Sequence, residues 1–217
     1  MQLTVLAASG PTGLSLTRQA LERGHIVRAV ARNPDRITVP DAPGLTKIVA
    51  DVFHTDEIAS ALEGSELVLS GLGVPKGTKP GVLTAGARSA VASGARVIWL
   101  GAYGTGPSAS VASALNRLVL KGLGAEVADK VESDAVVTEA GGTVFHAGPL
   151  SNKPISPDRR TVGLDASPRS IFRIMVSRDT VAAAMLDEAE NPRFPGRIAV
   201  PLTRCPRRPM GGSPAGR

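Results

Sequence analysis

Short apolar runs alternate with segments of helical period over the first hundred residues of the chain. Each run is rich in Val, Leu, Ile and Ala, as buried parallel strands are. Five such runs predict strands at residues 3–7, 25–31, 47–50, 67–70 and 96–100. The helices expected between them end at Gly24, Gly64 and Gly94, because glycine readily adopts the left-handed conformation that closes a helix. This alternation predicts an α/β fold, a doubly wound parallel sheet with right-handed crossovers.

The second half of the chain has a looser pattern. Helical segments are expected from residue 108 to Ala140, and a sixth strand at 143–146. Beyond Pro149, further prolines break the periodicity until a helix at 178–190 and a last strand at 198–200. No repeat or linker divides the chain, so we expect one domain.

That single domain is expected to span residues 1–202. Two of its stretches, 103–125 and 149–202, should supply most of a small substrate pocket. Residues 203–217 hold Pro, Gly and Arg and little that is apolar, so a disordered tail is predicted there.

Composition excludes several classes of protein. The net charge is +6, but arginines beyond residue 203 supply four of these charges, so residues 1–203 carry only +2. No nucleic-acid interface is expected from so weak and scattered a charge. One cysteine, Cys205, and three scattered histidines favour neither a disulfide framework nor a metal site. With no export leader and no apolar run of membrane length, the protein is expected in the cytoplasm without a membrane partner.

A glycine-rich turn follows the first predicted strand and opens the first helix. It consists of Ser9, Gly10, Pro11, Thr12 and Gly13. A pyrophosphate needs backbone N–H donors at a helix N-terminus, and the two glycines let the chain approach it closely. Ala7 stands where the usual first glycine of such loops lies, and the Thr12 hydroxyl either binds a phosphate or only favours the helix start. The pattern predicts a Rossmann-type dinucleotide site; a Gly-Pro turn without a ligand is the alternative.

The end of the second strand indicates which dinucleotide is bound. NAD sites usually carry an acidic residue there, which binds the ribose, whereas NADP sites carry a basic one. This chain has Arg32, and the first acid that follows is Asp35. Because a guanidinium pairs a phosphate bidentately, the expected cofactor is NADP(H). An exposed loop arginine with no ligand is the alternative reading.

Several stretches together resemble one superfamily. The matching segments are 7–13, 28–34, 50–52, 68–73, 145–150 and 177–183. They resemble the atypical short-chain dehydrogenase/reductases, especially the NmrA-like and the flavin/biliverdin-reductase-like NAD(P)-binding proteins. The resemblance covers roughly the first two hundred residues and is specific for the superfamily, but not for one reaction.

The resemblance implies roles for further residues. In that family the residue matching Asp51 accepts a hydrogen bond from the adenine amino group, and the one matching Val52 packs on the adenine ring. A loop-closing Asp51 is the alternative. The other matching cofactor segments contain Gly71, Leu72, Gly73, Pro149 and Leu150.

The usual catalytic pair of the superfamily is incomplete. It is a Tyr-x-x-x-Lys motif, whose spacing puts both side chains on one helix face. Here Lys130 is present, but Glu126 occupies the tyrosine position, so the standard proton donor is missing. Lys130 either contacts cofactor or substrate, or belongs to an ordinary solvated ladder of charges with Glu126 and Asp134.

Two other residues are candidates for acid–base chemistry. Tyr103, the only tyrosine, follows the fifth strand, and His146 ends the sixth. Both positions belong to the sheet edge where open parallel sheets bind ligands. Each has a structural alternative, an aromatic ring packed on the core for Tyr103 and a hydrogen-bonded buried histidine for His146.

The predicted function is an NADPH-dependent reductase of a small conjugated carbonyl, imine or flavin-like substrate. An NmrA-like redox sensor, which binds dinucleotide and a protein partner without turnover, is the alternative of another class. A third possibility is an isomerase or epimerase that removes and returns hydride. The sequence leaves both a monomer and a homodimer open.

Overall fold

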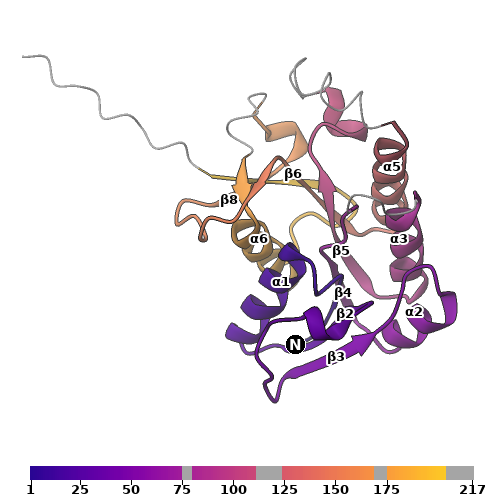
Figure 1. Ribbon diagram of the computed structural model, residues 1–217. Helices are drawn as coiled ribbons and strands as arrows, with labels where there is room; N and C mark the ends of the chain where they lie inside the picture. The colour runs from indigo at the N-terminus through magenta and orange to yellow at the C-terminus, as the bar shows by residue number, and fades with distance from the viewer. Residues whose placement is uncertain (75–79, 111–123, 169–174, 204–217) are drawn as a thin grey trace, which may run out of the picture.

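A computed structural model describes residues 1–74, 80–110, 124–168 and 175–203 of the chain (Figure 1). Its centre is an eight-stranded sheet in the order β3-β2-β1-β4-β5-β6-β10-β8. The strands are β1 (Gln2–Leu6), β2 (Ile26–Ala31), β3 (Leu45–Val49), β4 (Leu67–Ser70), β5 (Arg96–Ala102), β6 (Thr143–Ala147), β8 (Arg160–Gly163) and β10 (Ile198–Leu202). All neighbours pair in parallel except β8, which is antiparallel to β10.

Helices cover both faces of the sheet. They are α1 (Pro11–Glu22), α2 (Thr55–Leu62), α3 (Val82–Ala92), α5 (Gly124–Glu139) and α6 (Arg178–Glu190). The helices α1 and α6 pack together on one face, and α2, α3 and α5 lie on the other (Figure 1). The predicted doubly wound parallel sheet is therefore confirmed.

The sheet core has two layers because side chains alternate along each strand. On β1, Leu3 and Val5 join the cluster that contains Leu16 of α1, whereas Leu6 joins the opposite cluster with Trp99 of β5. Apolar runs without alternation in polarity, such as β4, are buried on both faces. The direction of winding reverses between β1 and β4. An apolar core lies on each face of the sheet there.

The sequence pattern missed three short strands. One is β8, and the other two are β7 (Leu150–Ser151) and β9 (Val176–Ser177), which form a separate parallel ladder. Two residues are too few to show a period, so only tertiary contact reveals such strands. The predicted tail beyond Thr203 lies outside the described residues. Residues 111–123, which belong to the predicted pocket region, also lie outside them.

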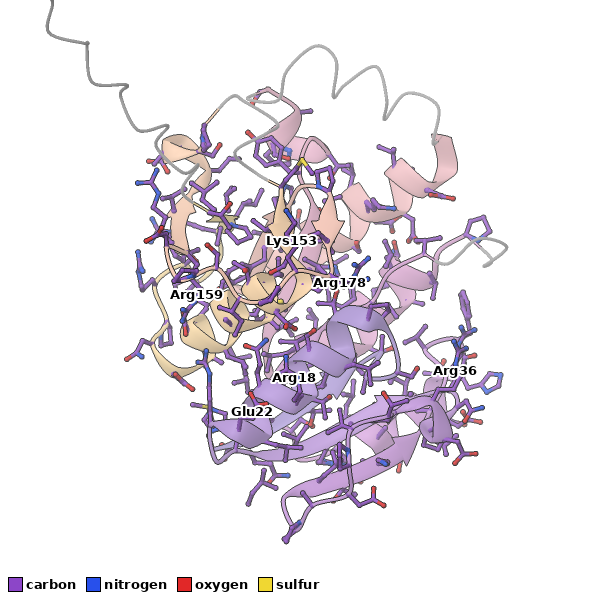
Figure 2. The ribbon with its side chains drawn as sticks, turned by 60° about the vertical axis from the view of Figure 1, so that its left-hand side comes forward. Arg18, Glu22, Arg36, Lys153, Arg159 and Arg178 are labelled. Atoms are coloured by element: carbon purple, nitrogen blue, oxygen red, sulfur yellow. The ribbon has the colours of Figure 1, made fainter. Side chains whose placement is uncertain are left out.

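Ion pairs fasten α6 to α1. Arg23 pairs with Glu190 at 3.1 Å and with Asp187 at 3.0 Å, and Arg18 pairs with Asp179 at 3.0 Å. Residues about 160 positions apart in the chain are thereby held side by side, with Arg18 and Glu22 on the outer surface of α1 (Figure 2). The start of α6 consequently lies close to the first turns of α1.

A buried carboxylate holds the start of α3. Asp129 of α5 accepts hydrogen bonds from four donors there, which are Gly81 N (3.2 Å), Leu83 N (3.1 Å), Thr84 N (2.9 Å) and Thr84 Oγ1 (2.7 Å). Burial alone would raise the pKa of Asp129, but these hydrogen bonds outweigh it and hold the pKa below its usual range. Asp129 is thus a helix cap supplied from another helix.

Replacing Asp129 by alanine should lower the free energy of unfolding by about 1–3 kcal/mol, because buried N–H donors at the start of α3 lose their acceptor. Urea denaturation measures this loss. Glu132→Ala is the matched control on the same helix, since Glu132 pairs with Arg88 on the exposed surface. An exposed pair contributes only about 0–1 kcal/mol. Equal losses in the two variants would contradict the capping role.

The stability difference between the unmodified protein and Asp129→Ala should also depend on pH. A lowered pKa in the folded state adds stability that is complete above the unfolded pKa of about 3.9. This contribution is lost as the pH falls through the lower folded pKa. The difference should therefore be constant from neutral pH to about pH 5 and shrink below about pH 4. A difference that grows on acidification would contradict this account.

Candidate functional site

A cleft of about 580 Å³ opens at the carboxyl edge of the sheet, where the winding reverses between β1 and β4. Its walls come from the segments that follow β1, β2, β3 and β4, together with Leu100, Leu150 and Arg178. Open α/β sheets bind ligands at this switch point, because the connections on its two sides lead to opposite faces and leave a crevice.

The loop between β1 and α1 forms the floor of the cleft. Ala7 has the left-handed φ of 55°, and its carbonyl accepts a hydrogen bond from Gly10 N at 2.9 Å. The loop thus has Ala7 in place of the usual first glycine, and Ala7 adopts the left-handed backbone conformation that glycine favours. Such a conformation costs an L-residue roughly 1–2 kcal/mol.

The N-terminus of α1 is ready to receive an anion. Gly10 is its N-cap and has no side chain to cap the helix, Pro11 follows, and the first turn contains no acidic residue. Ser9, Gly10, Pro11 and Thr12 all line the cleft. The unpaired N–H groups of this turn and the positive end of the helix dipole therefore lie at the cleft floor.

Gly13 has a different role from the one expected of it. It does not line the cleft, and a Cβ built on it would collide with the Ala7 carbonyl and come within 2.7 Å of Ala8 Cα. A Cβ on Gly71 would in turn lie 2.9 Å from Gly13 N. Gly13 is thus required for close packing of α1 against the ends of β1 and β4.

The end of the cleft beside β2 and β3 is basic. Arg32 follows β2, and Arg36 ends the short 3-10 helix Pro34–Arg36, whose start is capped by Asn33 Oδ1 at 3.0 Å from Asp35 N. Both arginines are exposed and line the cleft. The sequence interpretation missed Arg36, although the Asn-Pro start of a tight turn could have indicated that the chain folds back there.

The residues Asp51 and Val52 close the same end. Both line the cleft, and Asp51 Oδ1 accepts a hydrogen bond from Phe53 N at 3.0 Å. The loop-closing alternative for Asp51 is therefore present in the structure. It leaves the second carboxylate oxygen of Asp51 for a ligand in the cleft.

The opposite end of the cleft lies beyond β4. Gly71, Leu72, Gly73 and Leu150, which belong to the segments that the resemblance assigned to the cofactor, line it. Pro149 is exposed and outside the lining, and its carbonyl accepts a hydrogen bond from Val176 N at 3.4 Å. Arg178 also lines this end and was not among the predicted site residues.

The candidate lysine of the catalytic pair lies away from the cleft. Lys130 is half-buried on α5 and is not among the described residues that line the cleft. The alternative of a solvated ladder with Glu126 and Asp134 is wrong, because Asp134 is only 4% exposed and its carboxylate turns inward. A buried carboxylate requires a hydrogen-bonded partner rather than solvent.

That partner is His146, which is fully buried. Its Nε2 lies 2.9 Å from Asp134 Oδ2, and its Nδ1 lies 2.7 Å from Ser108 Oγ. Ser108 Oγ in turn accepts from Gly104 N at 2.7 Å and donates to the Thr105 carbonyl at 2.9 Å. This chain of hydrogen bonds ties the turn after β5 to α5 and β6, which matches the structural alternative rather than a catalytic base.

Tyr103 is also packed into the protein. It is 4% exposed and clusters with Val200 and Leu202 of β10. Its hydroxyl donates to the Pro168 carbonyl at 3.2 Å and lies 3.3 Å from Ser167 Oγ. The structure therefore brings neither Tyr103 nor His146 to the described walls of the cleft.

Two features are absent from the part of the chain that the structure describes. In the described part of the chain, no group of three or more His, Cys, Asp or Glu residues could hold a metal ion. No helix among the described residues is both long and apolar enough to cross a membrane.

We expect Gly13→Val to destabilise the fold, rather than only to block a ligand, because its side chain would collide with backbone. Overpacking of this kind costs about 1–3 kcal/mol or more in the free energy of unfolding. Gly10→Ala is the control, since a Cβ at Gly10 lies 3.2 Å from the Ala7 carbonyl and its φ of −79° suits any residue. Urea denaturation compares the two; equal stability of Gly13→Val and the unmodified protein would contradict the packing role.

Comparison with known proteins agrees with this geometry. A family model described as NAD(P)H-binding matches residues 7–192. A short-chain dehydrogenase/reductase from Veillonella parvula DSM 2008, solved in complex with NADP, has a TM-score of 0.76 at 18% identity, over 93% of this chain and 94% of that chain. The anaerobillin reductase ChuY from Escherichia coli O157:H7 has a TM-score of 0.75 at 18% identity, over 93% of this chain and 97% of that chain.

One curated relative matches locally. A 3-beta-hydroxysteroid dehydrogenase from Mycolicibacterium neoaurum is 34% identical over 67 residues, which are 31% of this chain and 18% of that protein. So short a match carries no activity across, and the solved structures, at this low identity, establish the shared fold. The family model spans most of the chain, from the turn at Ala7 to just beyond the end of α6. The chain therefore belongs to the NAD(P)H-binding family, with the Rossmann-type fold of the short-chain reductases.

Proposed function

We propose that this protein is an NADPH-dependent reductase that transfers hydride to a small conjugated carbonyl, imine or flavin-like substrate. The observation that carries the proposal is the combination of features in one cleft. An uncapped helix N-terminus lies at its floor, and two arginines lie at one end. These are the features that a pyrophosphate and a 2′-phosphate require, respectively.

The residues present fit a dinucleotide. The pyrophosphate would lie over Gly10, Pro11 and Thr12, with the backbone N–H of Thr12 as a donor, since Pro11 has no N–H and that of Gly10 donates to the Ala7 carbonyl. The adenine would lie between the ends of β2 and β3, near Asp51 and Val52. A Cβ on Gly73 would meet nothing within 4 Å, so the chain after β4 leaves open space for the rest of the cofactor.

The choice of NADPH over NADH rests on Arg32 and Arg36. A 2′-phosphate between two guanidinium groups would gain charge-assisted hydrogen bonds. Among the described lining residues, Asp51 is the only acid, and its Oδ1 already closes the loop to Phe53. At the end of β2, where NAD sites carry the carboxylate that binds the ribose hydroxyls, the described lining has Arg32 instead.

The nicotinamide end of the cleft combines an apolar wall with one cation. Leu72, Leu100 and Leu150 form the apolar wall, which suits a flat conjugated substrate, and Arg178 lines the same end. When bound, NADPH supplies the hydride, and with it both electrons of the reduction. The product also needs one proton, and the titratable groups among the described lining residues are three arginines and Asp51. We therefore assign the proton to water or to an acidic site of the substrate.

The burial of Tyr103 and His146 also favours one alternative, a redox sensor that binds NADP(H) without turnover. An isomerase or epimerase is less well supported. It needs a base beside the nicotinamide, and the only titratable group that the described walls offer at that end is Arg178.

Titration with NADPH and NADH tests the cofactor assignment. NADPH should bind more tightly, and Arg32→Ala should lose about 10- to 100-fold in NADPH affinity, the usual effect of one charged hydrogen bond. Arg36→Ala should weaken NADPH in the same direction, and NADH affinity should stay unchanged in both variants. Equal affinities in the unmodified protein would contradict the NADP assignment, and no binding of either would contradict the proposed function.

Turnover distinguishes the reductase from the sensor. The protein should oxidise NADPH with at least one member of a panel of flavins, quinones, enones and imines. Tyr103→Phe should keep kcat within about tenfold, since losing a positioned acid costs about 10²–10⁴-fold. A larger loss at unchanged NADPH affinity would restore Tyr103 as the proton donor. If no panel member is reduced and a protein partner is captured in only one redox state of the cofactor, the sensor is the correct function.

A further inference from the structure

One basic residue of the cleft is not explained by the cofactor. Arg178, the first residue of α6, lines the cleft together with Leu100 and Leu150. Figure 2 shows it near the start of α1, well apart from Arg36. Arg32 and Arg36 lie at the β2 end of the cleft, whereas Arg178 directly follows β9, which pairs with β7 at Leu150, and so lies with Leu150 beyond β4.

A short ladder of strands holds Arg178 in place. In the β7–β9 pair, Leu150 lies opposite Val176 and Ser151 opposite Ser177. Ser177 then caps α6, because its Oγ accepts a hydrogen bond from Thr180 N at 3.0 Å. One step further along, Arg178 Nη1 donates to Asn152 Oδ1 at 2.5 Å. The ladder and the cap therefore fix the backbone just before Arg178, and Asn152 holds one end of its side chain.

The charge of Arg178 is not neutralised within the described residues. The adjacent Asp179 turns away to α1, where its Oδ1 accepts from Ser15 Oγ at 2.6 Å and from Arg18 Nη2 at 3.0 Å. None of the ion pairs among the described residues includes Arg178, and its one hydrogen-bond partner there, Asn152, is neutral.

The position of Arg178, in the first turn of α6, is also unfavourable for a positive charge. The first turn of a helix carries the positive end of the dipole, so a basic residue there destabilises the helix slightly. A half-buried arginine that is fixed by a strand ladder, faces a cleft and has no carboxylate partner is available to an anionic ligand.

The direction of the cofactor indicates which ligand this is. With adenine between β2 and β3, the nicotinamide would lie past β4, where Leu100 and Leu150 line the cleft. The pyrophosphate already has the N–H groups at the start of α1 as donors. The group that approaches Arg178 is then the substrate.

We propose that Arg178 binds a carboxylate of the substrate, so that the substrate is an acidic conjugated carbonyl, imine or flavin-like compound. This inference rests on the proposed function and adds its substrate class. The guanidinium would take the carboxylate bidentately and hold the conjugated part of the substrate against the apolar wall. Arg178 is a specificity-determining residue and takes no part in the transfer of hydride.

The test uses two matched probes, trans-cinnamate and its neutral isostere trans-cinnamamide, titrated calorimetrically into the full-length protein saturated with NADP⁺. Cinnamate should bind about 10- to 100-fold more tightly than the amide. Arg178→Gln should abolish that preference while NADP⁺ affinity stays unchanged. Arg178→Lys should keep part of it, because lysine retains the charge but not the planar fork.

Arg159→Gln is the control variant, because it removes the same charge from a residue that pairs with Asp187 away from the cleft (Figure 2). It should keep the full preference for cinnamate. If NADP⁺ binds but cinnamate shows no preference, or neither probe binds, the inference is wrong while the proposed function stands. A loss of NADP⁺ affinity in Arg178→Gln with an unchanged probe ratio would assign Arg178 to the pyrophosphate instead. Failure of NADP⁺ itself to bind would overturn the proposed function and this inference together.

Discussion

The structure depends on one close backbone contact, in which the first turn of α1 lies directly against the turn that ends β1. Gly13 has no room for a Cβ beside the carbonyl of Ala7, and Gly71 has little room beside the N–H of Gly13. Three segments thus meet almost without side chains between them. Because nothing separates them, the N-terminus of α1 lies at the point where β1 and β4 diverge, and its N–H groups face the cleft.

The same helix positions α6 beside the site. The outer face of α1 carries Arg18 and Arg23, which pair with acidic residues of α6. Each of these pairs is partly exposed and contributes little stability alone. Their main effect is to fix the position of α6 relative to α1. Arg178 consequently reaches a cleft whose other walls, apart from Leu150, come from the first half of the chain.

Polar residues of the second half serve mainly to order loops. Asp129 holds the start of α3, and the Asp134–His146–Ser108 chain holds the turn after β5. A buried polar group is costly unless it is paired, so each such residue has found a fixed partner. His146, a candidate acid–base residue in the sequence, is thereby occupied with Asp134 and Ser108. A reductase can dispense with them, because hydride transfer requires only the cofactor and a well-placed substrate.

The sequence by itself determined the alternating sheet, the helix bounds at Arg178–Glu190 and the loop at Gly10, since apolar period and glycine placement are local properties. It also assigned Arg32 to the cleft, because strand order fixes which strand ends meet. Only the tertiary structure decided the rest. Burial turned His146 and Asp134 inward, Gly13 proved to be a packing residue, and Arg36 and Arg178 joined the lining. Which side chains share a cavity or a buried hydrogen bond depends on contacts between segments up to about 160 residues apart, and no local pattern encodes those contacts.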